Sequence, residues 1–144
     1  MIKKYISYSE EDTYKIGREI AEKLTAGTVV LLDGDLGTGK TVLTKGICDY
    51  FNVKNRVVSP TYTLVNEYIG DIKISHFDIY RLSDEDELYN IGFTDYLTDD
   101  AIVIVEWENN VSYDIYGENT IKIEISRSQD LVSPDREITV IEGE

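Results

Sequence analysis

The feature that most constrains the fold is the segment of residues 34–41, which reads Gly-Asp-Leu-Gly-Thr-Gly-Lys-Thr and matches the phosphate-loop pattern G-x-x-x-x-G-K-[ST]. Such a loop joins a buried strand to a helix. Residues 28–33, just before it, are short, β-branched and mostly apolar, as is typical of a strand covered on both faces. Apolar residues then recur at helical spacing, at Val42, Leu43, Ile47 and Phe51. The context therefore predicts a strand, a phosphate-binding loop and a helix, in that order.

The residue types in this loop suit a nucleoside triphosphate. Glycines allow backbone N–H groups to turn towards phosphate oxygens, and the positive end of the following helix adds to the attraction. Lys40 can neutralise phosphate charge, and the Thr41 hydroxyl can ligate Mg²⁺. The sequence therefore predicts a nucleotide-binding site that uses Mg²⁺.

Size and composition favour a single domain spanning residues 1–144. The chain is 42% hydrophobic and 29% charged, which is ordinary for a folded globular protein. The longest aliphatic run, residues 101–105, is too short to cross a bilayer, and the N-terminus has no apolar signal core. We therefore expect a cytoplasmic protein without membrane contact. Its single cysteine, Cys48, is expected to fill the core rather than to act as a nucleophile.

The charge balance bears on binding partners. The chain has 28 acidic and 14 basic residues, giving a formal net charge of -14. Such a surface repels phosphate backbones, so direct, tight binding of nucleic acid is not expected. Two interpretations of the acidic surface stay open at this point: solubility alone, and docking to a basic patch on a protein partner.

The motif and the remaining periodicity predict an α/β fold of the P-loop NTPase type, with a mixed central sheet of about seven strands flanked by helices. A first helix is expected to open at residues 9–12 and to close near residues 26–27. Further strands are expected at residues 3–8, at the end of 56–68, and at 72–79, 101–107, 120–126 and 136–141, with short helical segments at 84–89 and 94–97. The last two strands alternate in polarity, which suggests that they lie at an edge of the sheet, where a hairpin between them is plausible.

Two carboxylates at predicted strand ends are candidates for the hydrolytic chemistry that a phosphate loop alone does not supply. Glu106 ends a buried strand, where an open α/β sheet meets its ligand, and Mg²⁺ or a metal-bound water would satisfy it there. Asp78 ends a second apolar strand. Alternatively, Glu106 faces bulk solvent and Asp78 only caps a turn. The sequence does not show which of the two carboxylates binds the metal and which orients the water.

Four further features have both a functional and a structural interpretation. Residues 59–63, Ser-Pro-Thr-Tyr-Thr, form either a nucleotide-sensing switch or a turn that feeds a strand. The only histidine, His76, is more simply packed and hydrogen-bonded than catalytic. Arg81 either acts on the γ-phosphate or pairs with the acidic residues 84–87. Trp107 packs either near the nucleotide or in the core.

Several segments, taken in order, resemble one family. They are residues 34–41, Ser-Pro-Thr-Tyr-Thr-Leu-Val at 59–65, His-Phe-Asp-Ile-Tyr-Arg-Leu at 76–82, Glu-Leu at 87–88, Ile-Gly at 91–92, Asp-Tyr at 95–96 and Glu-Trp at 106–107. The ordered set is similar to the TsaE (YjeE) family, the bacterial ATPase of tRNA threonylcarbamoyladenosine modification. The resemblance implies an ATPase with ATP and Mg²⁺ as ligands, which binds a complex of the TsaB and TsaD proteins. It would support threonylcarbamoyl transfer to the adenosine next to the anticodon without performing that transfer.

The resemblance also implies roles for individual residues. Nucleotide contacts would come from Gly34, Gly37, Thr38, Gly39, Lys40, Thr41, Val42, Thr61 and Trp107. Thr41 and Glu106 would hold Mg²⁺. Asp78 and Lys40 would take part in hydrolysis, and Thr61 would belong to a nucleotide-responsive loop.

The base-binding site is less defined. No Asn-Lys-x-Asp segment, the usual guanine-reading sequence, is present, which disfavours a GTPase. For adenine, the candidates are the head of the first helix at residues 10–13 and the strand end near Ser126.

Two other functions stay open. A small-molecule kinase needs an acceptor pocket and usually an arginine-bearing lid, and the five arginines show no lid-like cluster. A nucleotide-dependent interaction module would keep the phosphate loop but would perform no useful hydrolysis. A measurement of phosphate release would distinguish such a module from an ATPase.

Overall fold

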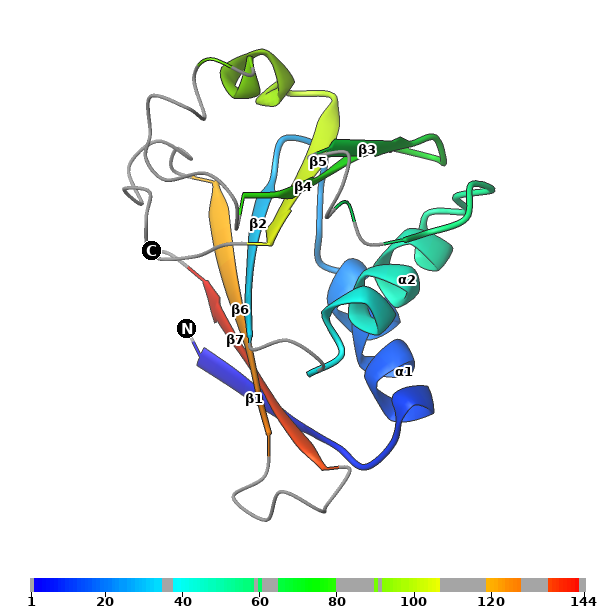
Figure 1. Ribbon diagram of the computed structural model, residues 1–144, viewed down its shortest axis with the longest axis vertical. Coiled ribbons are helices and arrows are strands. Elements are labelled where there is room, and N and C mark those ends of the chain that lie inside the picture. Colours follow the sequence, from blue (N-terminus) through cyan, green and yellow to red (C-terminus); the bar gives the residue numbers. More distant parts are fainter. Residues whose placement is uncertain are drawn as a thin grey trace.

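The computed structural model describes residues 2–34, 38–58, 60, 65–79, 90, 92–106, 119–127 and 135–142. Within these residues the chain forms one seven-stranded sheet, and α1 and α2 lie side by side on one side of it (Figure 1). The elements are β1 (Ile2–Ser7), α1 (Glu10–Ala21), β2 (Val29–Gly34), α2 (Lys40–Tyr50), β3 (Val65–Tyr68), β4 (Lys73–Asp78), the 3₁₀ helix η1 (Phe93–Tyr96), β5 (Ala101–Glu106), β6 (Thr120–Arg127) and β7 (Arg136–Glu142). The predicted α/β architecture with a mixed sheet is confirmed.

The sheet has a parallel centre and antiparallel margins. Its strand order is β1-β7-β6-β2-β5-β4-β3. The central strands β6, β2, β5 and β4 run parallel, whereas β1, β7 and β3 pair antiparallel with their neighbours. Because parallel strands end at the same edge, the carboxyl ends of β2, β4 and β5 lie together, which is where ligands bind in open α/β sheets.

The prediction that the last two strands lie at an edge of the sheet is wrong. β6 and β7 do pair as an antiparallel hairpin, but β6 also pairs with β2, and β1 covers the outer side of β7. The alternation in β6 has another cause. Ile123 and Ile125 point into the core beneath the helices, while intervening side chains are partly exposed. An alternating pattern therefore indicates that one face of a strand is covered. It does not indicate where in the sheet the strand lies.

Other boundaries differ by a few residues. α1 begins after Ser9, whose hydroxyl accepts the backbone N–H of Asp12 at 3.1 Å, as a helix N-cap does. The helix ends at Ala21 rather than near residues 26–27, and Gly27 lies in the following turn with a φ of 94°. The helical turn expected at 94–97 is η1. Residues 84–89 lie outside the described part of the chain.

The two helices approach each other closely through glycines. A Cβ atom on Gly17 would overlap the carbonyl oxygen of Leu43, and one on Gly46 would overlap the carbonyl oxygen of Tyr14. The Tyr14 hydroxyl also donates to the Asp49 carboxylate, which joins α1 to α2 at the surface. The backbone contact fixes α2, and with it the helix start at Lys40, against α1 and the sheet.

Cys48 is fully buried on α2, as expected for a core residue, and burial raises the pKa of its thiol to about 12. Because the thiolate is the reactive form, we expect iodoacetamide at pH 8 to alkylate Cys48 about 10³-fold more slowly in the native protein than in urea. Mass spectrometry over time measures both rates. Because the pKa of the Cys48 thiol is higher in the folded state, its protonated form contributes to the free energy of folding. This contribution is fully present below pH 9.0, the ordinary pKa, and is lost as the pH rises towards 12. Equal alkylation rates in the two states would contradict the prediction.

Candidate nucleotide-binding site

The phosphate-loop motif lies between β2 and α2 in the chain. β2 ends at Gly34 and α2 begins at Lys40, as the motif predicts. A Cβ on Gly34 would lie 2.8 Å from Thr38 Oγ1 and 2.9 Å from the Ile125 carbonyl oxygen, so only glycine fits there. Gly39 has a φ of 112°, in the left-handed region that glycine adopts without strain. Both positions therefore require glycine.

The first turn of α2 is suited to an anion. Its N-cap, Gly39, provides no side-chain hydrogen bond, and the turn contains no acidic residue. The first N–H groups of a helix have no partner within the helix and point towards a ligand bound there, and the helix dipole adds a partial positive charge. Lys40, Thr41 and Val42 are all partly exposed in this turn. They can contact a phosphate group bound in the loop.

A hollow of about 510 Å³, partly open to solvent, lies beside this helix start. It is lined by Ser9, Glu10, Thr13, Thr38, Gly39, Val42 and Arg136. The head of α1, a candidate for adenine contact, is thus next to the phosphate loop. Arg136 was not found by sequence reasoning, because nothing near it in the sequence resembles a nucleotide motif. It reaches the hollow because β7 begins there, beside Ser7 of β1.

The two carboxylates lie next to each other at the carboxyl ends of neighbouring strands. Asp78 on β4 pairs in register with Glu106 on β5, and Glu106 in turn pairs with Leu32 on β2. Asp78 is 9% exposed and Glu106 is 7% exposed. Glu106 therefore does not face bulk solvent, which removes the structural interpretation left open for it. Alternation along β5 places it on the face of Ile104, which packs in the core beneath α1 and α2.

His76 is fully buried directly below this site. Its Nε2 atom lies 3.3 Å from Oε2 of Glu106, and its Nδ1 atom lies 3.3 Å from the Tyr68 hydroxyl in a hydrogen bond. The carbonyl oxygen of Val58 lies 3.0 Å from the same hydroxyl, whose single proton can go to only one of these two acceptors at a time. Burial raises the pKa of Tyr68, although its hydrogen bonds to Asn66 and Val58 oppose this effect. The interpretation of His76 as packed and hydrogen-bonded agrees with this arrangement.

The donor set fits Mg²⁺. Oε2 of Glu106 is buried and has no hydrogen-bond partner that meets geometric criteria in the described structure, so a cation near this carboxylate would offset its burial. The described residues contain no group of three or more His, Cys, Asp or Glu side chains that could form a complete metal cage. Mg²⁺ usually binds through one or two carboxylates, waters and substrate phosphates. Glu106 is a carboxylate that could serve in this way, and Thr41 has the hydroxyl that the phosphate-loop motif offers to the metal.

Several predicted residues cannot be placed. Gly37, Thr61 and Trp107 lie outside the described residues, as do Arg81 and the acidic residues 84–87. Their roles stay predictions. The described candidate residues are Gly34, Thr38, Gly39, Lys40, Thr41 and Val42 near the start of α2, together with the strand-end carboxylates Asp78 and Glu106.

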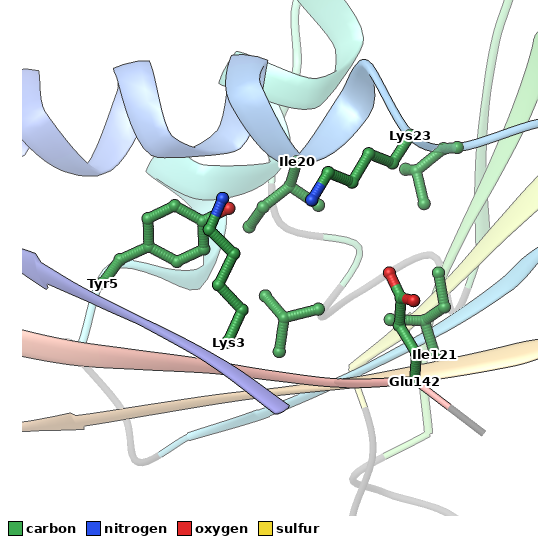
Figure 2. Close-up of a pocket in the computed structure, with 8 residues that line it drawn as sticks. Lys3, Tyr5, Ile20, Lys23, Ile121 and Glu142 are labelled. Atoms are coloured by element: carbon green, nitrogen blue, oxygen red, sulfur yellow. The ribbon is translucent and has the colours of Figure 1, made fainter. Parts of the chain in front are cut away.

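A second hollow lies under the other end of α1, and Figure 2 shows it between that helix and the strands β1, β6 and β7. Its apolar lining includes Ile20 of α1 and Ile121, near the start of β6. The ammonium group of Lys3 at its rim lies 3.6 Å from Glu19 and over the ring of Tyr5. This hollow is distant from the carboxyl end of β6, where Ile125 pairs with Gly34 of the phosphate loop. It is not part of the phosphate-binding site.

A family model described as "Threonylcarbamoyl adenosine biosynthesis protein TsaE" matches residues 7–138. The chain belongs to the TsaE family. It is 41% identical over 137 residues to the tRNA threonylcarbamoyladenosine biosynthesis protein TsaE of Aquifex aeolicus, covering 88% of this chain and 98% of that protein. It is 34% identical to the TsaE protein of Bacillus subtilis, covering 94% of this chain and 83% of the relative. These matches confirm the resemblance found in the sequence motifs.

The fold agrees with the family assignment. The crystal structure of Bacillus subtilis YdiB superposes with a TM-score of 0.79 at 28% identity, covering 100% of this chain and 87% of the other. The family assignment connects this chain with tRNA threonylcarbamoyladenosine biosynthesis. Among the described residues, no helix is both long and apolar enough to span a membrane.

Proposed function

We propose that this chain is a Mg²⁺-dependent ATPase that supports tRNA threonylcarbamoyladenosine modification through a TsaB–TsaD complex. The observation that carries the ATPase proposal is the position of Glu106. Its buried carboxylate ends β5, the strand paired with β2, and β2 leads directly into the phosphate loop. A carboxylate and a phosphate-binding helix start on adjacent elements are the parts that metal-assisted phosphoryl transfer needs.

In this proposal each residue has a distinct role. Lys40 and the N–H groups of the first turn of α2 bind the β- and γ-phosphates. Thr41 and Glu106 would hold Mg²⁺, and the bound metal would supply positive charge near the phosphate oxygens. Asp78, beside Glu106 in register, orients the attacking water. The hollow lined by Thr13 and Arg136 receives the nucleoside.

The acidic surface supports a role through protein partners. A formal net charge of -14 opposes direct contact with tRNA phosphates. We therefore propose that the tRNA is held by the TsaB–TsaD complex, and that this chain docks on the complex in the cytoplasm. Hydrolysis is expected to be weak for the chain alone and to become useful in the complex.

Replacement of Lys40 tests nucleotide binding. We expect Lys40→Ala to weaken ATP affinity by about tenfold or more, because a charge-assisted contact with phosphate contributes roughly 1.5–3 kcal/mol. Isothermal titration calorimetry with a non-hydrolysable ATP analogue measures the change. Lys45→Ala is the matched control, since Lys45 lies on the same helix and is exposed. Equal affinities of the wild type and Lys40→Ala would contradict the proposed binding mode.

A pull-down with TsaB and TsaD, combined with phosphate-release measurements, tests the rest of the proposal. We expect the wild type to bind the pair in a nucleotide-dependent manner and to release phosphate faster in the complex. Nucleotide-dependent binding without phosphate release, even beside the partners, would favour an interaction module. Transfer of phosphate to an added metabolite would favour a kinase.

A further inference from the structure

The buried contact between His76 and Glu106 requires an explanation that core packing does not provide. His76 is 0% exposed, and its Nε2 atom and Oε2 of Glu106 are 3.3 Å apart. Neither atom has a hydrogen-bond partner within the described residues. Burying two polar atoms in this way costs stability unless a favourable interaction compensates for it. The contact between His76 and Glu106 is therefore a candidate for a role in function.

The ring of His76 is held from its other side. The Tyr68 hydroxyl lies 3.3 Å from Nδ1, in a hydrogen bond in which either atom can be the donor. The carbonyl oxygen of Val58 lies 3.0 Å from the Tyr68 hydroxyl and accepts from Nδ2 of Asn66 at 3.1 Å. A hydroxyl has one proton, so Tyr68 cannot donate to Val58 and to Nδ1 at the same time. Because the Asn66 amide also donates to this carbonyl, the Tyr68 proton can be given to Nδ1 instead. In that tautomer the remaining proton of the ring is on Nε2, facing Glu106.

We propose that His76 is a positioning residue, which holds the carboxylate of Glu106 by Oε2 so that its other oxygen is presented to Mg²⁺. Tyr68 fixes the ring through Nδ1, and the Asn66 amide connects the Tyr68 hydroxyl to the backbone at Val58. This inference rests on the proposed function, in which Glu106 is a metal ligand. Groups that orient a metal ligand commonly change metal affinity by about 10–100-fold when they are removed.

The arrangement also links two parts of the site. Val58 directly precedes residues 59–63, the segment that the sequence identifies as a candidate nucleotide-sensing switch. The carbonyl of Val58, the Asn66 amide, the Tyr68 hydroxyl, the His76 ring and Glu106 form one continuous series of polar contacts. The metal ligand is thereby connected to the beginning of that segment.

Metal affinity provides the test. The probe is Mn²⁺, added to each protein bound to a non-hydrolysable ATP analogue, with free Mn²⁺ followed by electron paramagnetic resonance. We expect Tyr68→Phe and His76→Leu to bind Mn²⁺ about tenfold more weakly than the wild type, with unchanged affinity for the metal-free nucleotide. His76→Gln should retain most of the affinity, because the glutamine amide can still donate to Glu106.

The matched control is Tyr96→Phe. It is the same chemical change, in a tyrosine that packs against Phe77 on the opposite face of the sheet. A purely structural role for Tyr68 and His76 would lower the melting temperature and leave Mn²⁺ affinity unchanged. That result would overturn the inference, as would equal losses in His76→Gln and His76→Leu.

The inference and the proposed function fail in different ways. If the wild-type complex with nucleotide does not bind Mn²⁺, both are overturned. If the wild type binds Mn²⁺ and Tyr68→Phe binds it equally well, only the role of His76 and Tyr68 is overturned. Should His76→Leu not fold, Tyr68→Phe, which removes a single hydroxyl, decides the question alone.

Discussion

Glu106→Ala is expected to remove Mg²⁺-stimulated ATP hydrolysis, lowering its rate by roughly 10²-fold or more. A bound metal contributes several kcal/mol to stabilising the transition state, and each 1.36 kcal/mol corresponds to a factor of ten in rate. Glu106 is the buried carboxylate on the strand next to β2, and its loss would leave Mg²⁺ held mainly by Thr41 and the phosphates. Phosphate release, measured across a Mg²⁺ titration with the partner proteins present, gives the effect.

The control is Glu67→Ala, which removes an exposed carboxylate from β3 whose partner is Lys73 at 3.5 Å. Exposed ion pairs contribute little to stability, so this variant should keep wild-type hydrolysis. Nucleotide affinity in the absence of metal should be nearly unchanged in Glu106→Ala. A Mg²⁺ titration curve that Glu106→Ala leaves unaltered would contradict the assignment of this residue to the metal.

Gly46→Val is expected to destabilise the protein by about 3 kcal/mol or more, the upper part of the range for overpacking. A Cβ at this position would overlap the Tyr14 carbonyl oxygen, and it would also lie 3.1 Å from the backbone nitrogen of Arg18. Both neighbours are backbone atoms of a helix, so they cannot move aside as a flexible side chain would. Urea unfolding followed by circular dichroism measures the change in the free energy of unfolding.

Gly46→Ala separates this steric effect from helix propensity. Alanine favours a helix over glycine by about 1 kcal/mol, yet its methyl group meets the same overlap, so we expect a net loss of stability. Lys45→Val is the control for valine in α2, because Lys45 is the neighbouring residue and is exposed. A Gly46→Ala variant as stable as the wild type would show that the helices separate at little cost.

The candidate site was predictable where its residues are close in sequence. Gly34, Lys40 and Thr41 belong to one motif, and the motif itself requires a strand before it and a helix after it. Glu106 and Asp78 were found because each ends an apolar run. The contact of His76 with Glu106 was not found, because the residues lie on different strands and their proximity depends on how β4 and β5 pair.

The amino-acid sequence alone determined the phosphate-binding turn, the identity of the elements on either side of it and the approximate number of strands. These follow from backbone geometry and from periodic burial, both of which act over a few neighbouring residues. Tertiary structure alone decided the interior positions of β6 and β7, the glycine contact between α1 and α2 and the location of Arg136 beside the phosphate loop. Each depends on contacts between residues far apart in the chain, and a local pattern does not specify which distant segments will pair.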